Sequence, residues 1–355
     1  MDMWMALKYD ECVSMLRDHA TWASFGGQQA PDAPPPSMLS SDPPRHTRLR
    51  SLVSQAFTPR MVEQLEPRIR EIAAELLQPA IEAGECDLVE ALSYPLPVIV
   101  IAEILGVPPE DRNSFKEWSD EVVASLGTGI NGESRAVRQD IFEVMRDYLM
   151  AMVEERRNSP RNDLISGLVQ AEMDGEKLTF DELLQMLILL LVAGNETTTN
   201  LIGNAALEFM AHPDQLAKVR AEPGLIPSAI EEVLRFNSPV QATVRRPTRD
   251  VELSGKPIAK GTPVLVWLSA ANRDPAQFAE PLRFDVTRWP NRHIAFGMGI
   301  HFCLGAPLAR LEAKVAIEEL LLRVRGFERT TDDLPRVPTF IMRGVTSLPV
   351  ALQRA

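Results

Sequence analysis

The chain lacks most features that mark secreted, zinc-binding or nucleic-acid-binding proteins. Its 355 residues include only three cysteines, Cys12, Cys86 and Cys303, and no C-x-x-C or H-x-x-x-H pair. A disulfide framework and a closed zinc site are therefore disfavoured, and a reducing compartment fits best. Positive charge is also scarce, because 37 Lys and Arg face 49 Asp and Glu, a net charge of −12. This balance argues against general binding to nucleic acid or to an anionic membrane surface.

Long apolar runs are absent as well. The longest, residues 183–194, contains Gln185 and is too short to span a bilayer, so it predicts a buried helix. We find no signal peptide or membrane anchor at the start of the sequence. With 45% apolar and 24% charged residues, the composition is that of an ordinary globular protein. We therefore expect a cytoplasmic protein without a membrane anchor.

Helical patterns dominate what is present. Hydrophobic periodicity predicts helices over residues 9–18, 45–56, 59–83, 95–105, 109–125, 133–157 and 163–173. The longest helix should run from Phe180 to about Ala211, because Thr179 and Glu182 can form a capping box and His212-Pro213 ends it. Strand-like segments lie at residues 4–7, 243–252, 262–268 and 347–352. We predict one mainly α domain over residues 1–355, with small β-sheets.

One segment carries more functional information than the rest of the chain, Phe296-Gly297-Met298-Gly299-Ile300-His301-Phe302-Cys303-Leu304-Gly305. It places a cysteine in a glycine-rich turn, just before a helical segment that begins near Leu304. The three glycines allow close backbone approach to a flat group and unusual backbone conformations. A helix N-terminus also favours a thiolate over a thiol. Cys303 is therefore well placed to bind a metal from one side.

This segment resembles the cysteine-ligand loop F-x-x-G-x-H-x-C-x-G of the cytochrome P-450 haem-thiolate monooxygenases. The resemblance implies that Cys303 is the axial ligand of the iron of haem b, in a loop that also includes Phe296, Gly297, His301 and Gly305. A thiolate ligand pushes electron density towards O–O bond cleavage. The resemblance also implies the family's fold, in which a long central helix lies over the haem and the ligand loop lies beneath it.

The long predicted helix contains a run that is unfavourable to helices, Ala193-Gly194-Asn195-Glu196-Thr197-Thr198. Glycine and consecutive threonines weaken a helix interior, and threonine hydroxyls bond back to the preceding turn. Alone, this run indicates a locally loosened core helix. The resemblance assigns it to an acid–alcohol pair, in which Thr197 hydrogen-bonds dioxygen and Glu196 relays protons. Thr197 favours monooxygenation, while peroxide-driven oxygenation and non-catalytic gas binding stay open as alternatives.

Four further residues match positions that bind the two haem propionates in this family. His46 and Arg50 lie four apart on one helix face and fit its H-x-x-x-R segment, while Arg245 and His301 fit two other positions. Carboxylates prefer such converging cationic donors. Each residue alone would be more typical of a solvated charge or of a histidine with a partner in the core. The assignment depends on their occurrence together with the ligand loop.

Glu232 and Arg235 form an E-x-x-R pair on a predicted helix. The spacing alone is uninformative, since it recurs at residues 143/146, 154/157 and 280/283, where a surface ion pair is expected. This copy stands out by its position after the long helix and before Ser238-Pro239. The resemblance implies a buried, structural pair, joined by Arg288 or Arg292 from the irregular stretch 269–295. Loss of one member would leave a buried charge without a partner.

Family position alone indicates the substrate pocket and the partners. The pocket residues would be medium-sized and mostly apolar, so we expect an apolar organic substrate. The resemblance also implies electrons from NAD(P)H through a separate ferredoxin or flavodoxin with its reductase, docked on the cysteine side of the haem. Each candidate docking arginine has a simpler interpretation as an ordinary solvated side chain. The candidate pocket residues are Leu190, Val240, Ala242, Thr243, Ile341 and Met342, and the candidate docking residues are Arg45, Arg48, Arg60 and Arg310.

The sequence departs from the family pattern in two places. It begins later than usual, so we expect either a compact family member or a true start further upstream. The connection between Ser24 and Asp42 is short and contains Pro31 and Pro34-Pro35-Pro36. It leaves too few residues for the usual roofing helix and its linkers. We therefore predict an open distal pocket, or one covered by a mobile loop.

Overall fold

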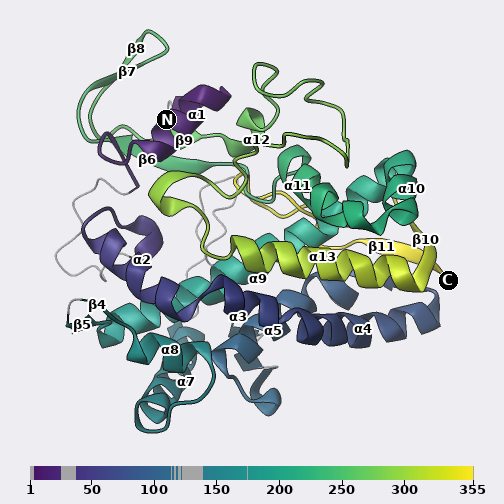
Figure 1. The fold of residues 1–355 in the computed structure, drawn as a ribbon, viewed down its shortest axis with the longest axis horizontal. Coiled ribbons are helices and arrows are strands. Elements are labelled where there is room, and N and C mark those ends of the chain that lie inside the picture. The colour runs from purple at the N-terminus through teal and green to yellow at the C-terminus, as the bar shows by residue number, and fades with distance from the viewer. Residues whose placement is uncertain are drawn as a thin grey trace.

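The computed structural model describes residues 4–24, 37–112, 139–173 and 175–354, together with residues 114, 115, 117, 118 and 121. Helices make up most of this structure, and small sheets lie at its edges (Figure 1). The longer helices are α1 (Tyr9–Arg17), α2 (Arg45–Ala56), α4 (Glu66–Ala83), α5 (Pro95–Leu105), α7 (Gln139–Asn158), α8 (Leu164–Gln170), α9 (Phe180–Ala211), α10 (Pro213–Ala221), α11 (Ile226–Phe236) and α13 (Ala306–Arg323).

The long helix α9 has the predicted bounds. Its capping box forms as expected, because Thr179 Oγ1 accepts from the Glu182 amide at 3.2 Å and Glu182 Oε2 accepts from the Thr179 amide at 3.1 Å. Among the described residues, α9 alone is long and apolar enough to cross a membrane, yet 56% of its most apolar stretch is buried inside the molecule. It is a core helix, as predicted from the sequence.

Several predicted helix bounds need correction. The segment 59–83 is two helices, α3 (Pro59–Gln64) and α4, and Pro67 in the first turn of α4 fits a helix start. The segment 163–173 ends at Gln170 and continues into a short hairpin of β4 (Glu172–Met173) and β5 (Glu176–Lys177). Residues 109–111 form a 3-10 turn. Parts of the predicted helices 109–125 and 133–157 lie outside the described residues.

Two small sheets flank the helices. In the first, of order β1-β9-β6-β2, β1 (Trp4–Ala6) is parallel to β9 (Val264–Val266), while β6 (Thr243–Pro247) and β2 (Trp22–Ala23) extend it antiparallel. The second joins β10 (Val324–Arg329), β11 (Pro349–Arg354) and β3 (Glu85–Asp87). The predicted strand 243–252 breaks after Pro247, and β7 (Val251–Leu253) pairs instead with β8 (Lys256–Ile258). Leu268 starts the short helix α12 (Leu268–Ala271) and does not extend a strand.

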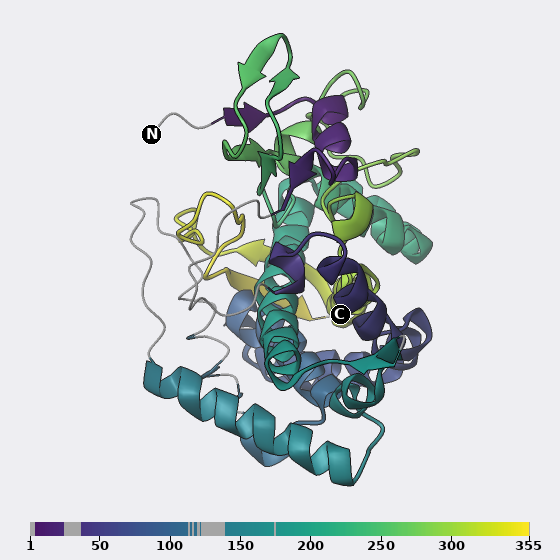
Figure 2. The same cartoon turned by 90° about the vertical axis from the view of Figure 1, so that its left-hand side faces the viewer.

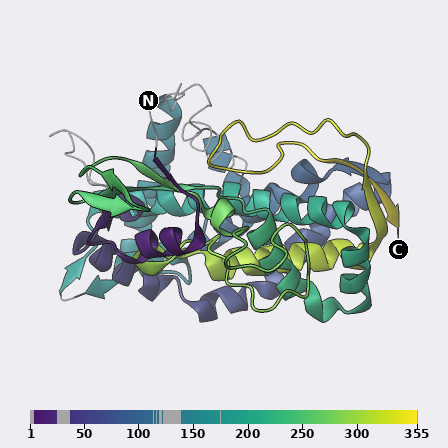
Figure 3. The same cartoon turned by 90° about the horizontal axis from the view of Figure 1, so that it is seen from above.

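The main apolar core lies where α9 packs against α5 and α13, and where α13 packs against α4. Helix α7 lies along one edge of this helical layer (Figure 2). A smaller apolar core fills the space between α1 and the first sheet. The strands of the second sheet lie near the C-terminal end of α13 (Figure 3). The segment before α13 therefore lies between two cores, with α1 on one side and the long helices on the other.

Candidate functional site

The cysteine loop is a tight turn closed by its own backbone. The Cys303 amide donates to the Phe296 carbonyl at 2.9 Å, and the Gly297 amide donates to the Ile294 carbonyl at 2.9 Å. Gly297 and Gly299 adopt left-handed φ values of 68° and 70°, so glycine is needed at both positions.

The close backbone approach expected at the three glycines needs correction. A Cβ atom at Gly299 would lie 2.4 Å from the Leu16 carbonyl, so the backbone here approaches helix α1. Gly305 has an ordinary φ of −80°, and a Cβ there would meet no described atom within 4 Å. A Cβ at Gly297 would lie 3.7 Å from the His301 carbonyl oxygen, an ordinary contact distance, so Gly297 and Gly305 are both less crowded than Gly299.

Cys303 is mostly buried, three residues before the start of α13. Burial raises the pKa of its thiol, while the Gly305 amide, the positive charge of Arg50 and the Ala306 amide act in the opposite direction. The expected helix-terminal donors are therefore present, but in the protein chain alone burial outweighs them. A positively charged partner for the sulfur, such as a metal ion, would reverse this balance.

The structure brings together the four predicted propionate-binding residues, and one of them, Arg50, lies near Cys303. The rings of His46 and His301 lie 4.2 Å apart between centroids. Arg50 lies close enough to Cys303 for their charges to interact. Burial, reinforced by His46 and Arg245, lowers the pKa of His301 to about 4. Burial also lowers the pKa of Arg245. Burial thus disfavours the charged forms of His46, Arg245 and His301, because the site is poorly solvated.

Several polar atoms of this cluster lack partners. Within the described part of the chain, neither ring nitrogen of His46 is hydrogen-bonded, although only 2% of the residue is exposed. His301 Nε2 is also buried without a hydrogen bond, with Asp42 Oδ1 3.9 Å away. Buried polar groups are normally paired, so unpaired ones indicate an additional ligand. Donors of this kind suit a group that carries carboxylates, as haem does, and the residues present therefore fit haem.

The threonine-rich run of α9 is continuous helix and is not interrupted. Thr197 Oγ1 donates to the Ala193 carbonyl at 2.7 Å, which is the back-bonding expected of threonine. A Cβ atom at Gly194 would meet no described atom within 4 Å. Burial raises the pKa of Glu196. Glu196 and Thr197 therefore combine an acid of raised pKa with a hydroxyl on a locally open stretch of helix.

Sequence reasoning missed a buried acid on α13. Glu312 is 2% exposed, and burial raises its pKa to about 8 against a hydrogen bond with Thr198, which lowers it. It joins the helix after Cys303 to the helix that carries Thr197. The sequence signal that could have identified Glu312 is its spacing. It lies four residues after Leu308 and four before Ala316, so the three side chains share one face of the helix, and this face is buried.

The E-x-x-R pair is buried, as predicted. Glu232 and Arg235 are both 0% exposed and form two hydrogen bonds of 2.7 and 2.8 Å. Arg235 also donates to the carbonyls of Asn272, Pro281 and Arg283. Of the two predicted partners, Arg288 joins the pair, with Nε 3.1 Å from Glu232 Oε1. The Arg292 carbonyl instead accepts from Tyr9 Oη at 2.7 Å.

Three of the four candidate docking arginines are already paired. Arg45 and Arg48 both form ion pairs with Glu182 at the start of α9. Arg310 forms two hydrogen bonds to Glu231, of 2.7 and 2.9 Å. Arg60 is exposed. The paired residues offer little uncompensated positive charge to an acidic partner.

The predicted pocket residues come from three segments, two of which lie side by side. Val240 forms a β-bridge with Met342, and the Gln241 amide donates to the Ile341 carbonyl at 2.8 Å. Ala242 is buried, whereas Thr243 and Leu190 are partly exposed. Met342 also lines a cavity of about 360 Å³, together with Gln241, Arg336, Val337, Thr339, Phe340, Arg343 and Gly344. Most of the connection between Ser24 and Asp42, predicted to leave the pocket open, lies outside the described residues, namely residues 25–36. Its described part contains a 3-10 turn at Met38–Ser40.

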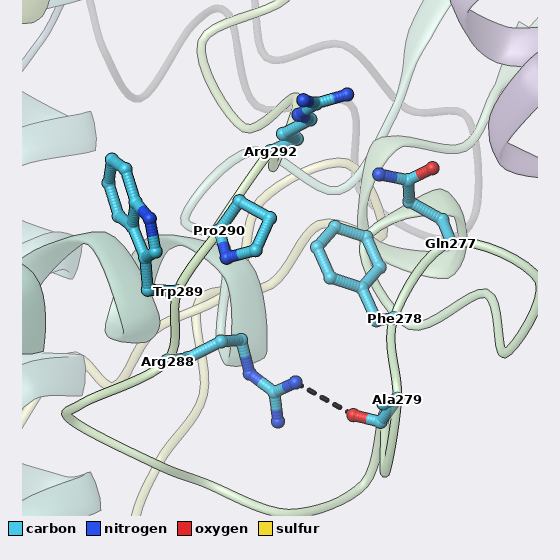
Figure 4. Close-up of a pocket in the computed structure, with 7 residues that line it drawn as sticks. All are labelled: Gln277, Phe278, Ala279, Arg288, Trp289, Pro290 and Arg292. Carbon is cyan, nitrogen blue, oxygen red and sulfur yellow. Dashed lines mark hydrogen bonds between the residues drawn. The ribbon is translucent and has the colours of Figure 1, made fainter.

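A second cavity of about 360 Å³ lies in the irregular stretch before the cysteine loop (Figure 4). In Figure 4, Phe278 points towards Pro290, and Arg288 donates to the Ala279 carbonyl at 2.7 Å. Trp289 is 92% exposed at its rim. None of the predicted haem or substrate residues lines this cavity.

The sequence profile of the cytochrome P450 family matches residues 29–347. The chain is 42% identical over 364 residues to cytochrome P450 monooxygenase PikC of Streptomyces venezuelae. This match covers 99% of this chain and 86% of the relative. It is also 42% identical over 319 residues to 6-deoxyerythronolide B hydroxylase of Saccharopolyspora erythraea, and that match covers 89% of this chain and 78% of the relative.

Solved structures agree with these relatives. The crystal structure of CYP109E1 from Bacillus megaterium in complex with testosterone matches with a TM-score of 0.90 and 40% identity, over 98% of this chain and 93% of that one. The cytochrome P450 PksS of Bacillus subtilis 168 matches with a TM-score of 0.93 and 40% identity, over 99% and 90%. The predicted mainly α fold with small sheets is confirmed.

Proposed function

The chain belongs to the cytochrome P450 family, and from this premise we propose how its own residues perform the family's reaction. It is a haem-thiolate monooxygenase with haem b as cofactor, and it inserts one oxygen atom of O2 into an organic substrate. Cys303 supplies the thiolate. The observation that carries this assignment is a partly buried cysteine near Arg50 and near two histidines, His46 and His301, whose buried ring nitrogens include three without a hydrogen bond among the described residues.

The residues around Cys303 hold the cofactor. Arg50, Arg245, His301 and His46 would bind the propionates, and these carboxylates would supply partners for the ring nitrogens of His46 and His301 that have none among the described residues. Phe296, Gly297 and Gly305 shape the turn that presents the sulfur. Glu232 and Arg235 fix the irregular stretch that precedes this turn. When bound, haem supplies the iron centre that activates dioxygen.

Helix α9 carries the two residues that deliver protons to the site. Thr197 offers its hydroxyl to the reacting dioxygen, which requires it to release or share its bond to the Ala193 carbonyl. Glu196 passes protons from solvent, a task that suits an acid with a raised pKa. The open surroundings of Gly194 leave space beside both residues.

The substrate is an apolar organic molecule held by Leu190, Val240, Ala242, Thr243, Ile341 and Met342. Two named relatives act on or bind large, largely apolar molecules, 6-deoxyerythronolide B and testosterone. A polyketide or a steroid is therefore the first substrate class to test. Each compound would be titrated into the ferric protein, and the spectral change that accompanies displacement of water from the iron would be recorded. The resulting affinities would rank the compounds.

A separate redox protein supplies the electrons, as monooxygenases of this family require. We infer a ferredoxin or a flavodoxin with its reductase, and a cytoplasmic location for the reaction.

Isotope labelling tests the reaction type. The protein, a ferredoxin, its reductase and NADPH are supplied with ¹⁸O2 and a compound that displaces water from iron. Monooxygenation predicts one ¹⁸O atom in the product and none from labelled water. Product formation with hydrogen peroxide but none with the electron-donor system would contradict it in favour of a peroxygenase.

A further inference from the structure

Two neighbouring glutamates of α11 make separate contacts. Glu232 faces inward and binds Arg235 and Arg288, as described above. Glu231 faces the cysteine loop, where its carboxylate receives two hydrogen bonds from Arg310 on α13 and one of 3.0 Å from His293 Nε2. Burial alone would raise the pKa of Glu231, but the hydrogen bonds from His293 and Arg310 outweigh it and hold this pKa at about 2. Glu231 is therefore an anion in this cluster.

The Glu231 cluster reaches the backbone beneath Cys303. His293 Nδ1 accepts from the Ala295 amide at 3.2 Å, so its Nε2 carries the proton donated to Glu231. The Arg310 guanidinium lies over the Phe296 ring, 4.6 Å from its centroid. Phe296 in turn supplies the carbonyl that accepts from the Cys303 amide at 2.9 Å. Three elements, α11, the loop and α13, thus meet at one residue that contacts the cysteine.

The cluster also contains two opposite charges. Glu231 contributes one negative charge and Arg310 one positive charge. Removing either charged partner would leave the other uncompensated near the sulfur. An added negative charge disfavours an added electron, whereas an added positive charge favours it.

We propose that Glu231, His293 and Arg310 are positioning residues for the haem thiolate, which fix Phe296 beside Cys303, and that the opposite charges of Glu231 and Arg310 set how readily the haem accepts an electron. The inference rests on the proposed role of Cys303. It gives Arg310 a role within the protein, in place of the candidate docking role or the ordinary solvated side chain considered from the sequence. It also gives His293 a function that its place in the sequence did not indicate.

The test compares the variants Glu231→Gln and Arg310→Gln with a matched ion pair elsewhere. Arg68 and Glu103 form a similar two-point contact between α4 and α5, and Arg68 is 39% exposed against 37% for Arg310. For each purified haem protein, two quantities are measured. One is the ratio of reduced to oxidised iron at a fixed applied potential, and the other is the rate at which the reduced carbonyl adduct loses its thiolate ligand.

The expected shifts in the reduction ratio have opposite signs. Glu231→Gln should raise the ratio and Arg310→Gln should lower it, each of order tenfold, because one leaves a positive and the other a negative charge. Both variants should lose the thiolate ligand several-fold faster than wild type. Arg68→Gln and Glu103→Gln should change neither quantity. Loosening of the fold alone would shift both variants in the same direction.

Equal behaviour of the Glu231, Arg310 and control variants would overturn the inference. Should Arg310→Gln fail to take up haem, Arg310→Lys replaces it, because it keeps the charge but loses the two-point contact. It is then expected to keep the wild-type reduction ratio and to lose the thiolate faster, and wild-type values for both would contradict the positioning role. A wild-type protein without a thiolate-ligated carbonyl adduct would instead refute the proposed function, before any variant is compared.

Discussion

Two parts of the proposed site are built differently: the loop 296–305 with its supporting contacts, here the Cys303 wall, and the stretch of α9 that carries Glu196 and Thr197, here the α9 wall. The Cys303 wall is held by a network in which backbone carbonyls, two glutamates and several arginines are bonded together. The α9 wall is a single continuous helix, and its Thr197 hydroxyl donates to the Ala193 carbonyl within its own turn. The first arrangement gives a fixed position for the metal ligand, and the second leaves a hydroxyl that can change partners. The metal ligand Cys303 is thus held by many contacts, whereas the Thr197 hydroxyl, which takes part in proton transfer, is held by few.

The largest difference between the walls should appear at Cys303 itself. Cys303→Ala removes the only proposed metal ligand, so we expect loss of the thiolate-ligated carbonyl adduct and at least severely reduced haem content. Pyridine haemochrome assay and the reduced carbonyl spectrum measure both. Cys86→Ser, at a half-buried site in β3, is the control and should match wild type. A thiolate spectrum in Cys303→Ala would contradict the assignment.

The network of the Cys303 wall should depend on the burial of its charges. Glu232→Gln leaves Arg235 and Arg288 without their anion, and we expect a loss of about 3–5 kcal/mol in the free energy of unfolding. Glu280→Gln breaks a pair of the same spacing that is 70% and 53% exposed, and should cost less than about 1 kcal/mol. Urea unfolding of the two variants compares them directly. Equal losses would show that burial of the pair is not what matters.

Glu312 joins the two walls and should make their contact sensitive to pH. Its pKa rises from an ordinary 4.5 to about 8 in the folded protein, so the folded state keeps a proton that the unfolded state releases. The resulting stability is complete below about pH 4.5 and is lost as the pH rises to about 8. Relative to Glu312→Gln, wild type should lose up to about 1.4 kcal/mol per pH unit across this window. Urea unfolding at pH 5, 6.5 and 8 measures this, and a constant difference would contradict it.

The smallest expected effect on stability lies on the α9 wall. Thr197→Ala removes a hydroxyl without disturbing the Cys303 wall, so haem content and the free energy of unfolding should stay near wild type. Product formed per NADPH consumed should fall about tenfold, because protons reach the dioxygen less reliably. Thr248→Ala, whose hydroxyl bonds to the Ala20 carbonyl at an exposed position, is the matched control. Unchanged coupling in Thr197→Ala would remove this threonine from the mechanism.

The parts of the molecule that the sequence predicted are those governed by local chemistry. The capping box of α9, the stop at His212-Pro213 and the turn around Cys303 depend on neighbours in the chain, and the structure contains each of them. Errors occurred where local signals compete. The sequence around Pro67 is compatible both with one long amphipathic helix and with the start of a new helix. In the structure, Pro67 lies in the first turn of α4.

The contacts that the sequence could not predict join distant segments. His293 contacts Glu231 across 62 positions, and Arg288 contacts Glu232 across 56. Glu312 has no pattern of its own beyond a place on an apolar helix face, where a buried acid is unexpected. Choosing Arg288 over Arg292 likewise required the path of the irregular stretch, which no periodicity describes.

The most direct test of the account is the absorption spectrum of the purified, reduced protein under carbon monoxide. A sulfur anion from Cys303 on iron predicts the strongly red-shifted main band that is characteristic of thiolate-ligated haem. A protein that contains no haem, or a band at the position found for histidine-ligated globins, would contradict it.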